Sequence, residues 1–180
     1  MSFYPFLVAQ LPLLFFDSRA PVSMQALARY AAEWLPAEEG DTLLRLAAGE
    51  WPDHPVIRDY RQFDVGLRNQ LALLRGTRMN RDPEPYLLGS ERPDHVTRQV
   101  LADCVKDENR EHAERMIDSL RWKFIEDRTV MDSFNFTFLV AYFLKLRILE
   151  RWSQLDEQRG LELLQAALEE RPKDPVGTPS

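Results

Sequence analysis

The residues whose types could support catalysis or metal binding are few and scattered in this sequence. His54, His95 and His112 are far apart, and none lies in a spacing that places two imidazoles on one helical face. Glu108 and His112 are four residues apart and can share a helical face, where we expect them to pair at the surface. Because two ligands without a second cluster do not complete a closed metal site, the sequence predicts neither a metal nor a cofactor.

Cys104 is the single cysteine and lies in an apolar helical stripe. A free thiol in that setting usually serves as small packing material, so we expect Cys104 to be buried rather than nucleophilic. The glycine-rich motifs that cradle nucleotide phosphates and the Gly-x-Ser-x-Gly turn of hydrolases do not occur. These observations favour a protein that is not an enzyme; a scattered site built from Glu108, His112 and Cys104 is the competing interpretation.

Four arginines stand out by their spacing. Arg61, Arg68 and Arg75 repeat every seven residues, which places them along one line of a helix, with Arg58 nearby. We call these four residues the basic ridge. It is either a solvated flank whose stems lie on apolar surface, or a contact for acidic helices of a partner. The formal net charge of −6 argues against binding to nucleic acid or to an anionic membrane.

Aromatic residues concentrate in the C-terminal third of the chain, in a predicted helix that is apolar on nearly all sides. They are Phe134, Phe136, Phe138, Tyr142, Phe143 and Trp152. Most such rings pack in a core, but a bundle of 180 residues has limited means to cover one helix on every side. Any exposed ring would be a natural hot spot. We therefore predict that Trp122, Tyr142, Lys145 and Trp152, with the basic ridge, bind a partner.

The composition is that of an ordinary globular domain, with 44% hydrophobic and 29% charged residues. One cysteine and no secretory pattern indicate a cytoplasmic protein. The first sixteen residues are apolar, but Pro5 and Pro12 interrupt them and the run is too short to span a membrane. We expect this segment to be a buried extended or short helical start.

Apolar residues that recur every three or four positions predict an all-α, single-domain bundle of about six or seven helices. The expected helices lie at about residues 23–35, 36–48, 56–75, 94–104, 113–124, 134–152 and 161–168. Ser23, and Asp132 or Ser133, are placed to cap two of them. Gly160 is expected to separate or kink the last helical stretch.

The glycines and prolines after residue 75 predict a long connection in the middle of the chain. The expected domain covers residues 1–171, with halves 1–75 and 93–171 joined by residues 76–92, and residues 172–180 form a flexible tail. Within the connection, Pro85 to Leu88 are expected to pack onto the core.

Three stretches of the sequence resemble a bacterial family of uncharacterised proteins that are typically encoded among the subunits of V/A-type ATPases. The stretches are YPFLVAQLP at 4–12, FDVGLRNQLALLR at 63–75 and VAYFLKLRILERW at 140–152. The last two are also similar to helices of the subunit named C or d in the archaeal-type enzyme. That subunit, which we call the funnel subunit, is a longer helical funnel that links the rotating central stalk to the membrane ring.

The resemblance implies a non-catalytic subunit or accessory protein of a V/A-type ATPase, with the central stalk and the membrane ring as partners. It implies a cytoplasmic location, or a peripheral one at the inner membrane through the complex. An assembly factor for the same complex is an alternative. A self-associating helical adaptor without an ATPase role is another, and a homo-oligomer is compatible with either.

Overall fold

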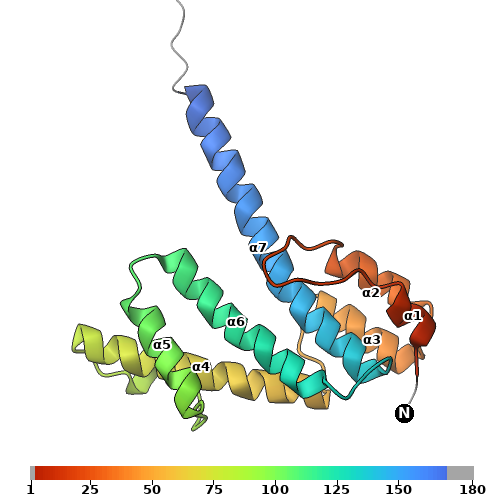
Figure 1. Cartoon of the computed structure of the whole chain (residues 1–180), viewed down its shortest axis with the longest axis horizontal. Coiled ribbons are helices and arrows are strands. Elements are labelled where there is room, and N and C mark those ends of the chain that lie inside the picture. Colours follow the sequence, from red (N-terminus) through yellow and green to blue (C-terminus); the bar gives the residue numbers. More distant parts are fainter. Residues whose placement is uncertain (1–2, 170–180) are drawn as a thin grey trace, which may run out of the picture.

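The regular elements of residues 3–169 are all helices, as Figure 1 shows, so the prediction of an all-α protein is confirmed. The computed structural model describes residues 3–169. Within this range the helices are α1 (Pro5–Ala9), α2 (Met24–Ala32), α3 (Ala37–Ala47), α4 (Pro55–Met79), the 3₁₀ turn η1 (Glu84–Tyr86), α5 (His95–Lys106), α6 (Arg110–Thr129) and α7 (Phe136–Glu169). The predicted tail at 172–180 lies outside the described residues.

The larger of two buried clusters forms around the first half of α7. Leu139, Phe143 and Leu146 have no exposed surface, and residues of α2, α3, the start of α4 and the end of α6 pack around them. Burying one such side chain contributes about 1.5–3 kcal/mol. The bundle therefore covers this half of α7 on nearly all sides, although the sequence suggested that it has limited means to do so.

A second, smaller cluster joins the remaining helices. Leu67 of α4, Leu101 of α5 and Ile117 of α6 are buried together, and Cys104 packs with them at 4% exposure. The prediction that Cys104 fills a core is confirmed. The two clusters do not follow the predicted halves of the chain, because the larger one combines residues from both ends of the sequence.

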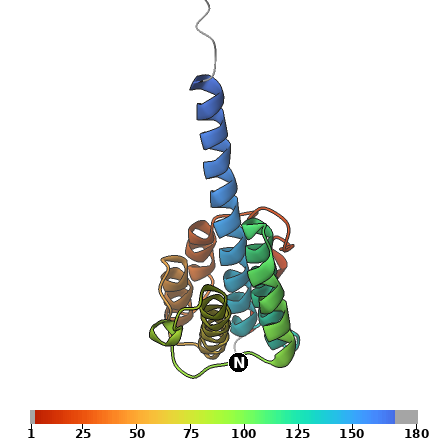
Figure 2. The same ribbon diagram turned by 90° about the vertical axis from the view of Figure 1, so that its left-hand side faces the viewer.

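Helix α7 is continuous where a separation or kink was expected. Its 34 residues run through Gly160, and a helix of that length is about 51 Å long. From Gln154 to Glu162 every side chain is exposed, whereas Trp152 is buried. Figures 1 and 2 show this second half of α7 rising out of the bundle. The expectation that Gly160 separates the last helical stretch from the helix before it was therefore wrong.

Two predicted helix caps differ from the structure. Helix α7 begins at Phe136, and the side chain of Asn135, rather than Asp132 or Ser133, accepts a hydrogen bond from the amide of Phe138 at 2.9 Å. Ser23 stands at the cap position of α2 but makes no side-chain cap bond. Glu150 of α7 accepts from the first amide of α2, Met24, at 3.0 Å, so one helix caps another.

The central connection begins later than predicted, because α4 continues to Met79. Asn80 caps the helix in the left-handed region, with a φ of 50°. The close return of the chain explains why Gly76 lies inside this helix. A Cβ atom there would lie 2.9 Å from the carbonyl oxygen of Arg81 and 3.0 Å from Pro83 Cβ. Glycine thus permits the tight approach of the connection to the end of α4.

The connection does not pack onto the core through Pro85 to Leu88 as expected, since Tyr86 and Leu88 are more than half exposed. Asn69, which is fully buried, holds it instead. The Asn69 amide donates to the carbonyls of Leu88 and Glu91 at 3.1 and 3.2 Å, and its oxygen accepts from the amide of Leu88 at 2.7 Å. A polar anchor therefore replaces the predicted apolar contact.

Candidate interaction surfaces

The basic ridge lies on α4, but its four arginines have different surroundings. Arg58 pairs with Asp53 at 2.6 Å, and Arg68 pairs with Asp64 at 2.8 Å. The guanidinium of Arg61 lies 5.8 Å from the centre of the Trp51 ring. Within residues 3–169, the side chain of Arg75 has no hydrogen bond or ion pair. Arg75 is thus the member of the ridge whose charge is least committed within the chain.

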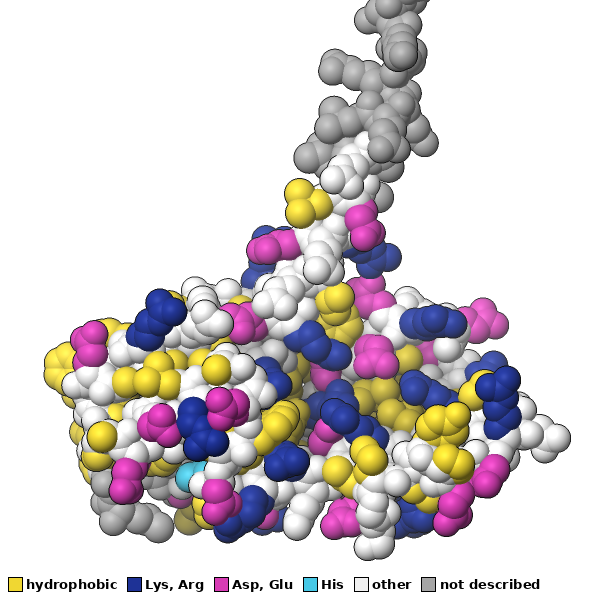
Figure 3. All heavy atoms as spheres, turned by 180° about the vertical axis from the view of Figure 1, so that it is seen from behind, with side chains coloured by type: hydrophobic (Ala, Val, Ile, Leu, Met, Phe, Trp, Pro, Cys, Tyr) yellow, Lys and Arg dark blue, Asp and Glu magenta, His cyan; other side chains and the backbone are white. Residues whose placement is uncertain are grey.

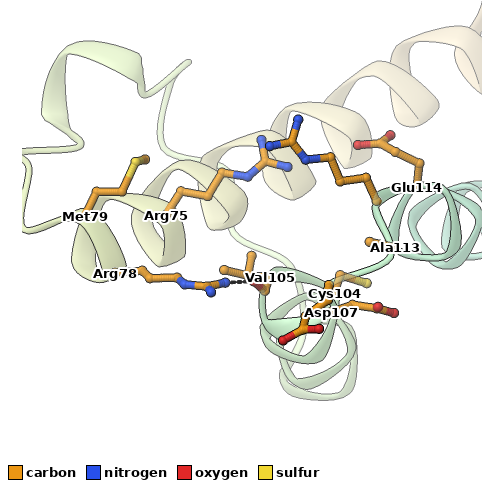
Figure 4. Close-up of a pocket in the computed structure, with 10 residues that line it drawn as sticks. Arg75, Arg78, Met79, Cys104, Val105, Asp107, Ala113 and Glu114 are labelled. Atoms are coloured by element: carbon orange, nitrogen blue, oxygen red, sulfur yellow. Dashed lines mark hydrogen bonds between the residues drawn. The ribbon is translucent and has the colours of Figure 1, made fainter.

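Arg75 stands between two hollows at the end of α4. Arg75 and Met79 line both of them, one of about 760 Å³ towards α5 and α6, the other of about 330 Å³ towards the connection. Figure 4 shows Arg75 and Arg78 reaching from α4 into the larger hollow, where Arg78 donates to the carbonyl of Val105. This end of α4 therefore combines positive charge with concave surface.

The larger hollow contains two residues of the alternative enzymatic interpretation, Cys104 and Glu108. Burial raises the pKa of the Cys104 thiol, which disfavours the reactive thiolate. The predicted pairing of Glu108 with His112 was wrong: His112 Nδ1 lies 2.5 Å from a carboxylate oxygen of Asp107. The hydrogen bond from His112 lowers the pKa of Asp107. This arrangement does not supply a nucleophile next to a base.

Metal binding and membrane insertion find no support in the described part of the chain. Among residues 3–169, no group of three or more His, Cys, Asp or Glu side chains could hold a metal ion. In the same range, no helix has both the length and the apolar character needed to cross a membrane.

The predicted aromatic candidates Trp122, Tyr142 and Trp152 are 7%, 7% and 8% exposed. Their polar atoms are bonded within the chain. Trp122 Nε1 donates to Glu126 at 2.8 Å, and the Tyr142 hydroxyl donates to the carbonyl of Pro12 at 2.8 Å. Burial raises the pKa of Tyr142 to about 12. These rings were predicted to bind a partner on the condition that they are exposed, and all three are buried.

Lys145 is similarly occupied. Its ammonium group pairs with Glu126 at 2.9 Å and lies 4.8 Å from the centre of the Trp122 ring. The pair fixes α7 against α6. Lys145 therefore contributes to the packing of α7, and 19% of its side chain is exposed.

A buried charged junction connects α4, α6 and α7. Asp118, at 1% exposure, accepts from Arg121 and Trp152 Nε1 at 2.7 Å each, and also from Arg151. Arg121 also donates to Asp64 at 2.8 Å. Burial alone would lower the pKa of Arg121, but the Asp64 charge and the hydrogen bond to Asp118 outweigh it and raise that pKa. These ionic groups hold one another in place and leave no donor of Trp152 for a partner.

A group of exposed aromatic rings comes mainly from the first 34 residues of the chain and is joined by Phe134 from the C-terminal third. Phe3, Phe6, Tyr30, Trp34 and Phe134 are 65%, 61%, 37%, 50% and 39% exposed, and we call them the N-terminal aromatic surface. The rings of Phe6 and Trp34 are 5.2 Å apart, and those of Phe3 and Phe134 are 5.7 Å apart. In Figure 3, hydrophobic side chains are visible along the left of the body, the side on which α1 to α3 lie.

The N-terminal segment holds these rings in place. Leu7 is buried at 3% exposure, the amide of Tyr4 donates to the carbonyl of Phe134, and Pro12 accepts from Tyr142. The expectation that residues 1–16 are buried was wrong for Phe3, Phe6, Leu13 and Phe15, which are all more than 60% exposed. The prolines that interrupt the run were the signal, because they prevent one long helix from burying a continuous face.

These features define a class: an all-helical protein with exposed apolar and basic surfaces. The chain belongs to the family described as Protein of unknown function (DUF2764), whose model matches residues 48–170. No curated protein and no solved structure matches the chain.

Proposed function

We propose that this chain is a non-catalytic component of a V/A-type ATPase, which acts by binding other subunits in the manner of the funnel subunit. The partners are the central stalk and the membrane ring, so the chain is cytoplasmic and peripheral at the membrane through the complex. The proposal rests on the resemblance of residues 4–12, 63–75 and 140–152 to proteins encoded with that enzyme. The main structural support comes from one surface, and the shape of α7 adds to it.

That surface is the N-terminal aromatic surface, the single observation that carries a binding function. Exposed apolar patches on soluble proteins mark interaction sites, because their exposure to water is unfavourable until a partner covers them. Phe6 and Trp34 are at least half exposed and yet are held by a segment anchored through Leu7 and Pro12. Rings that are already ordered lose little conformational entropy on binding, which favours their use as hot spots.

The shape of α7 gives further support. Its first half lies in the larger core, and its second half stands outside the bundle (Figure 2). A rigid helix fixed at one end can contact a partner well away from the body of the protein. The exposed leucines Leu155 and Leu161, at 46% and 60%, provide apolar contact points on this part of α7.

The direct test is to purify the ATPase and its assembly intermediates from the native source. We expect this chain in at least one of them at a stoichiometry close to that of single-copy subunits. A permanent subunit is expected in the mature enzyme, and an assembly factor in intermediates alone. Absence from both would reject the proposal.

The role of the aromatic surface is tested by the double variant Phe6→Glu with Trp34→Glu. We expect loss of association with the ATPase while the helical circular dichroism is retained. The matched control is Val96→Glu on α5, an apolar side chain that is 71% exposed and far along the chain from this surface. Retained association in the double variant would show that another surface binds the complex.

A further inference from the structure

The smaller hollow at the end of α4 has the character of a helix-binding groove. Leu71, Met79, Pro83 and Tyr86 supply apolar lining, and the charged residues that line it are three arginines and one carboxylate, Arg68, Arg75, Arg81 and Asp82. In the described chain the side chains of Arg75 and Arg81 have no hydrogen bond or ion pair. An apolar floor with uncompensated cations at its rim suits an apolar side chain that is flanked by carboxylates.

The exposed end of α7 has the complementary character. Leu161 is 60% exposed, Glu157 precedes it by one helical turn, and Glu162 follows it directly. Both carboxylates lack an ion pair within residues 3–169. The helix runs about 21 Å from Leu155 to Glu169, and α4 runs about 17 Å from Arg68 to Met79 before the chain turns back at Asn80. The two elements therefore complement each other in charge and in apolar content.

Within one molecule these two elements cannot meet. Figures 1 and 2 show the second half of α7 rising away from the body, whereas the end of α4 lies at one side of the bundle. Helix α7 is continuous through Gly160, so no break in it allows the end to fold back. The contact requires a second copy of the chain.

We infer that the groove at the end of α4 binds the exposed end of α7 from a second copy of this chain. Leu161 enters the apolar groove, and Glu157 and Glu162 pair with Arg75 and Arg81. The interface uses different surfaces of the two copies, so a reciprocal exchange closes as a dimer and a one-way exchange builds longer oligomers. This inference concerns self-association, and its test uses the isolated chain, so the result does not decide the proposed ATPase role.

Sedimentation velocity of the full-length chain tests this inference, over concentrations from about 5 to about 500 µM, a range that spans the affinities of small interfaces. We expect association that increases with concentration and weakens in high salt. Charge reversal on one side, Arg75→Glu with Arg81→Glu, should weaken it at least about tenfold, and so should Glu157→Arg with Glu162→Arg. Mixing these two variants should restore association, since each supplies the surface that complements the other.

The matched control is Arg19→Glu with Arg29→Glu, which makes the same charge change on exposed arginines at the α2 side of the body. This control should associate like the original chain. A monomer at every concentration would overturn the inference. Association that is insensitive to the groove variant, or a mixture of variants that stays monomeric, would overturn it as well, because both outcomes point to another surface. Thermal unfolding of each variant distinguishes lost binding from lost folding.

Discussion

Trp34 and Trp152 are the same residue type in opposite situations. Trp152 is 8% exposed, its Nε1 donates to Asp118 at 2.7 Å, and Arg115 covers its ring at 4.4 Å. Trp34 is 50% exposed and packs on one side against Phe6. The comparison teaches that the aromatic content of a helix does not reveal a binding surface. What matters is whether the fold supplies partners for the ring and its polar atom.

The largest expected effect is the difference in stability loss when each of these two tryptophans is replaced by alanine. Trp152→Ala removes a buried ring and is expected to lower the free energy of unfolding by about 3–5 kcal/mol. Trp34→Ala should lower it by about 1 kcal/mol or less, because half of the ring already contacts water. Urea denaturation of both variants measures the difference.

For binding, Trp34→Ala should have the larger direct effect, because it should weaken association with the ATPase. Trp152→Ala should change association only through the loss of folded protein. Equal stability losses for the two variants would contradict the distinction between a core ring and a surface ring. That result would place Trp34 among the residues that stabilise the fold.

The charged junction beneath Trp152 gives the next largest effect. Asp118→Ala leaves Arg121 and Trp152 Nε1 without their buried acceptor and is expected to cost about 3 kcal/mol or more. The matched control is Asp156→Ala, the loss of an exposed carboxylate on the free part of α7, with an expected change within about 0.5 kcal/mol. Chemical denaturation that gives a small loss for both would show that the junction contributes little to holding α7.

Two glycines allow the packed end of α4 to be compared with the exposed part of α7. Gly76→Ala places a Cβ against the carbonyl of Arg81 and is expected to cost about 1–3 kcal/mol. Gly160→Ala meets no atom within 4 Å and should stabilise the local helix by up to about 1 kcal/mol. Thermal unfolding and circular dichroism measure the two effects. A loss of stability in the second variant would contradict a helix that is continuous through Gly160.

The smallest effect is the dependence of stability on pH through His54. Its Nδ1 accepts from the amide of Val56 at 3.3 Å, and burial, followed by the charge of Arg58, lowers its pKa although Asp53 opposes the shift. The folded chain thus favours neutral His54. Stability is complete above the ordinary pKa of about 6.5 and is lost as the pH falls through the lowered value.

His54→Asn tests this assignment, because asparagine caps helices without titrating in this range. The variant should keep its stability near neutral pH and lose less than the original chain when the pH is lowered from about 7.5 to about 5. Thermal unfolding at both pH values measures the loss of stability. An identical loss in both chains would assign the acid sensitivity to other groups.

Much of the fold could be predicted from the sequence, because apolar periodicity records which face of a helix is buried. It identified α2, α3, α4 and the first half of α7, and it placed Cys104 in a core. The caps and breaks were less predictable. Met24 is capped by Glu150, which is 126 residues away, and Gly160 lies in a helix that continues through it. Such contacts depend on tertiary arrangement rather than on neighbouring residues.

The candidate surfaces were predicted only in part. The seven-residue spacing identified the basic ridge, and Arg75 is its member with no ion pair, hydrogen bond or ring contact in the described chain, whereas Arg61 contacts the Trp51 ring. The aromatic prediction named rings that the fold covers, because covering depends on which helices pack around α7. Phe6 was missed because an apolar segment is ordinarily expected to be buried, and Trp34 because it continues the apolar stripe of its helix.

The most direct measurement is hydrogen–deuterium exchange of the free chain and of the chain purified with the ATPase. If other components of the enzyme cover the N-terminal aromatic surface, amides in residues 3–16 and 30–34 should exchange more slowly in the complex. Amides around Asp118, which is already buried in the free chain, should exchange alike in both. Unchanged exchange at residues 3–16 and 30–34 in a complex that contains the chain would contradict the claim that this surface binds the ATPase.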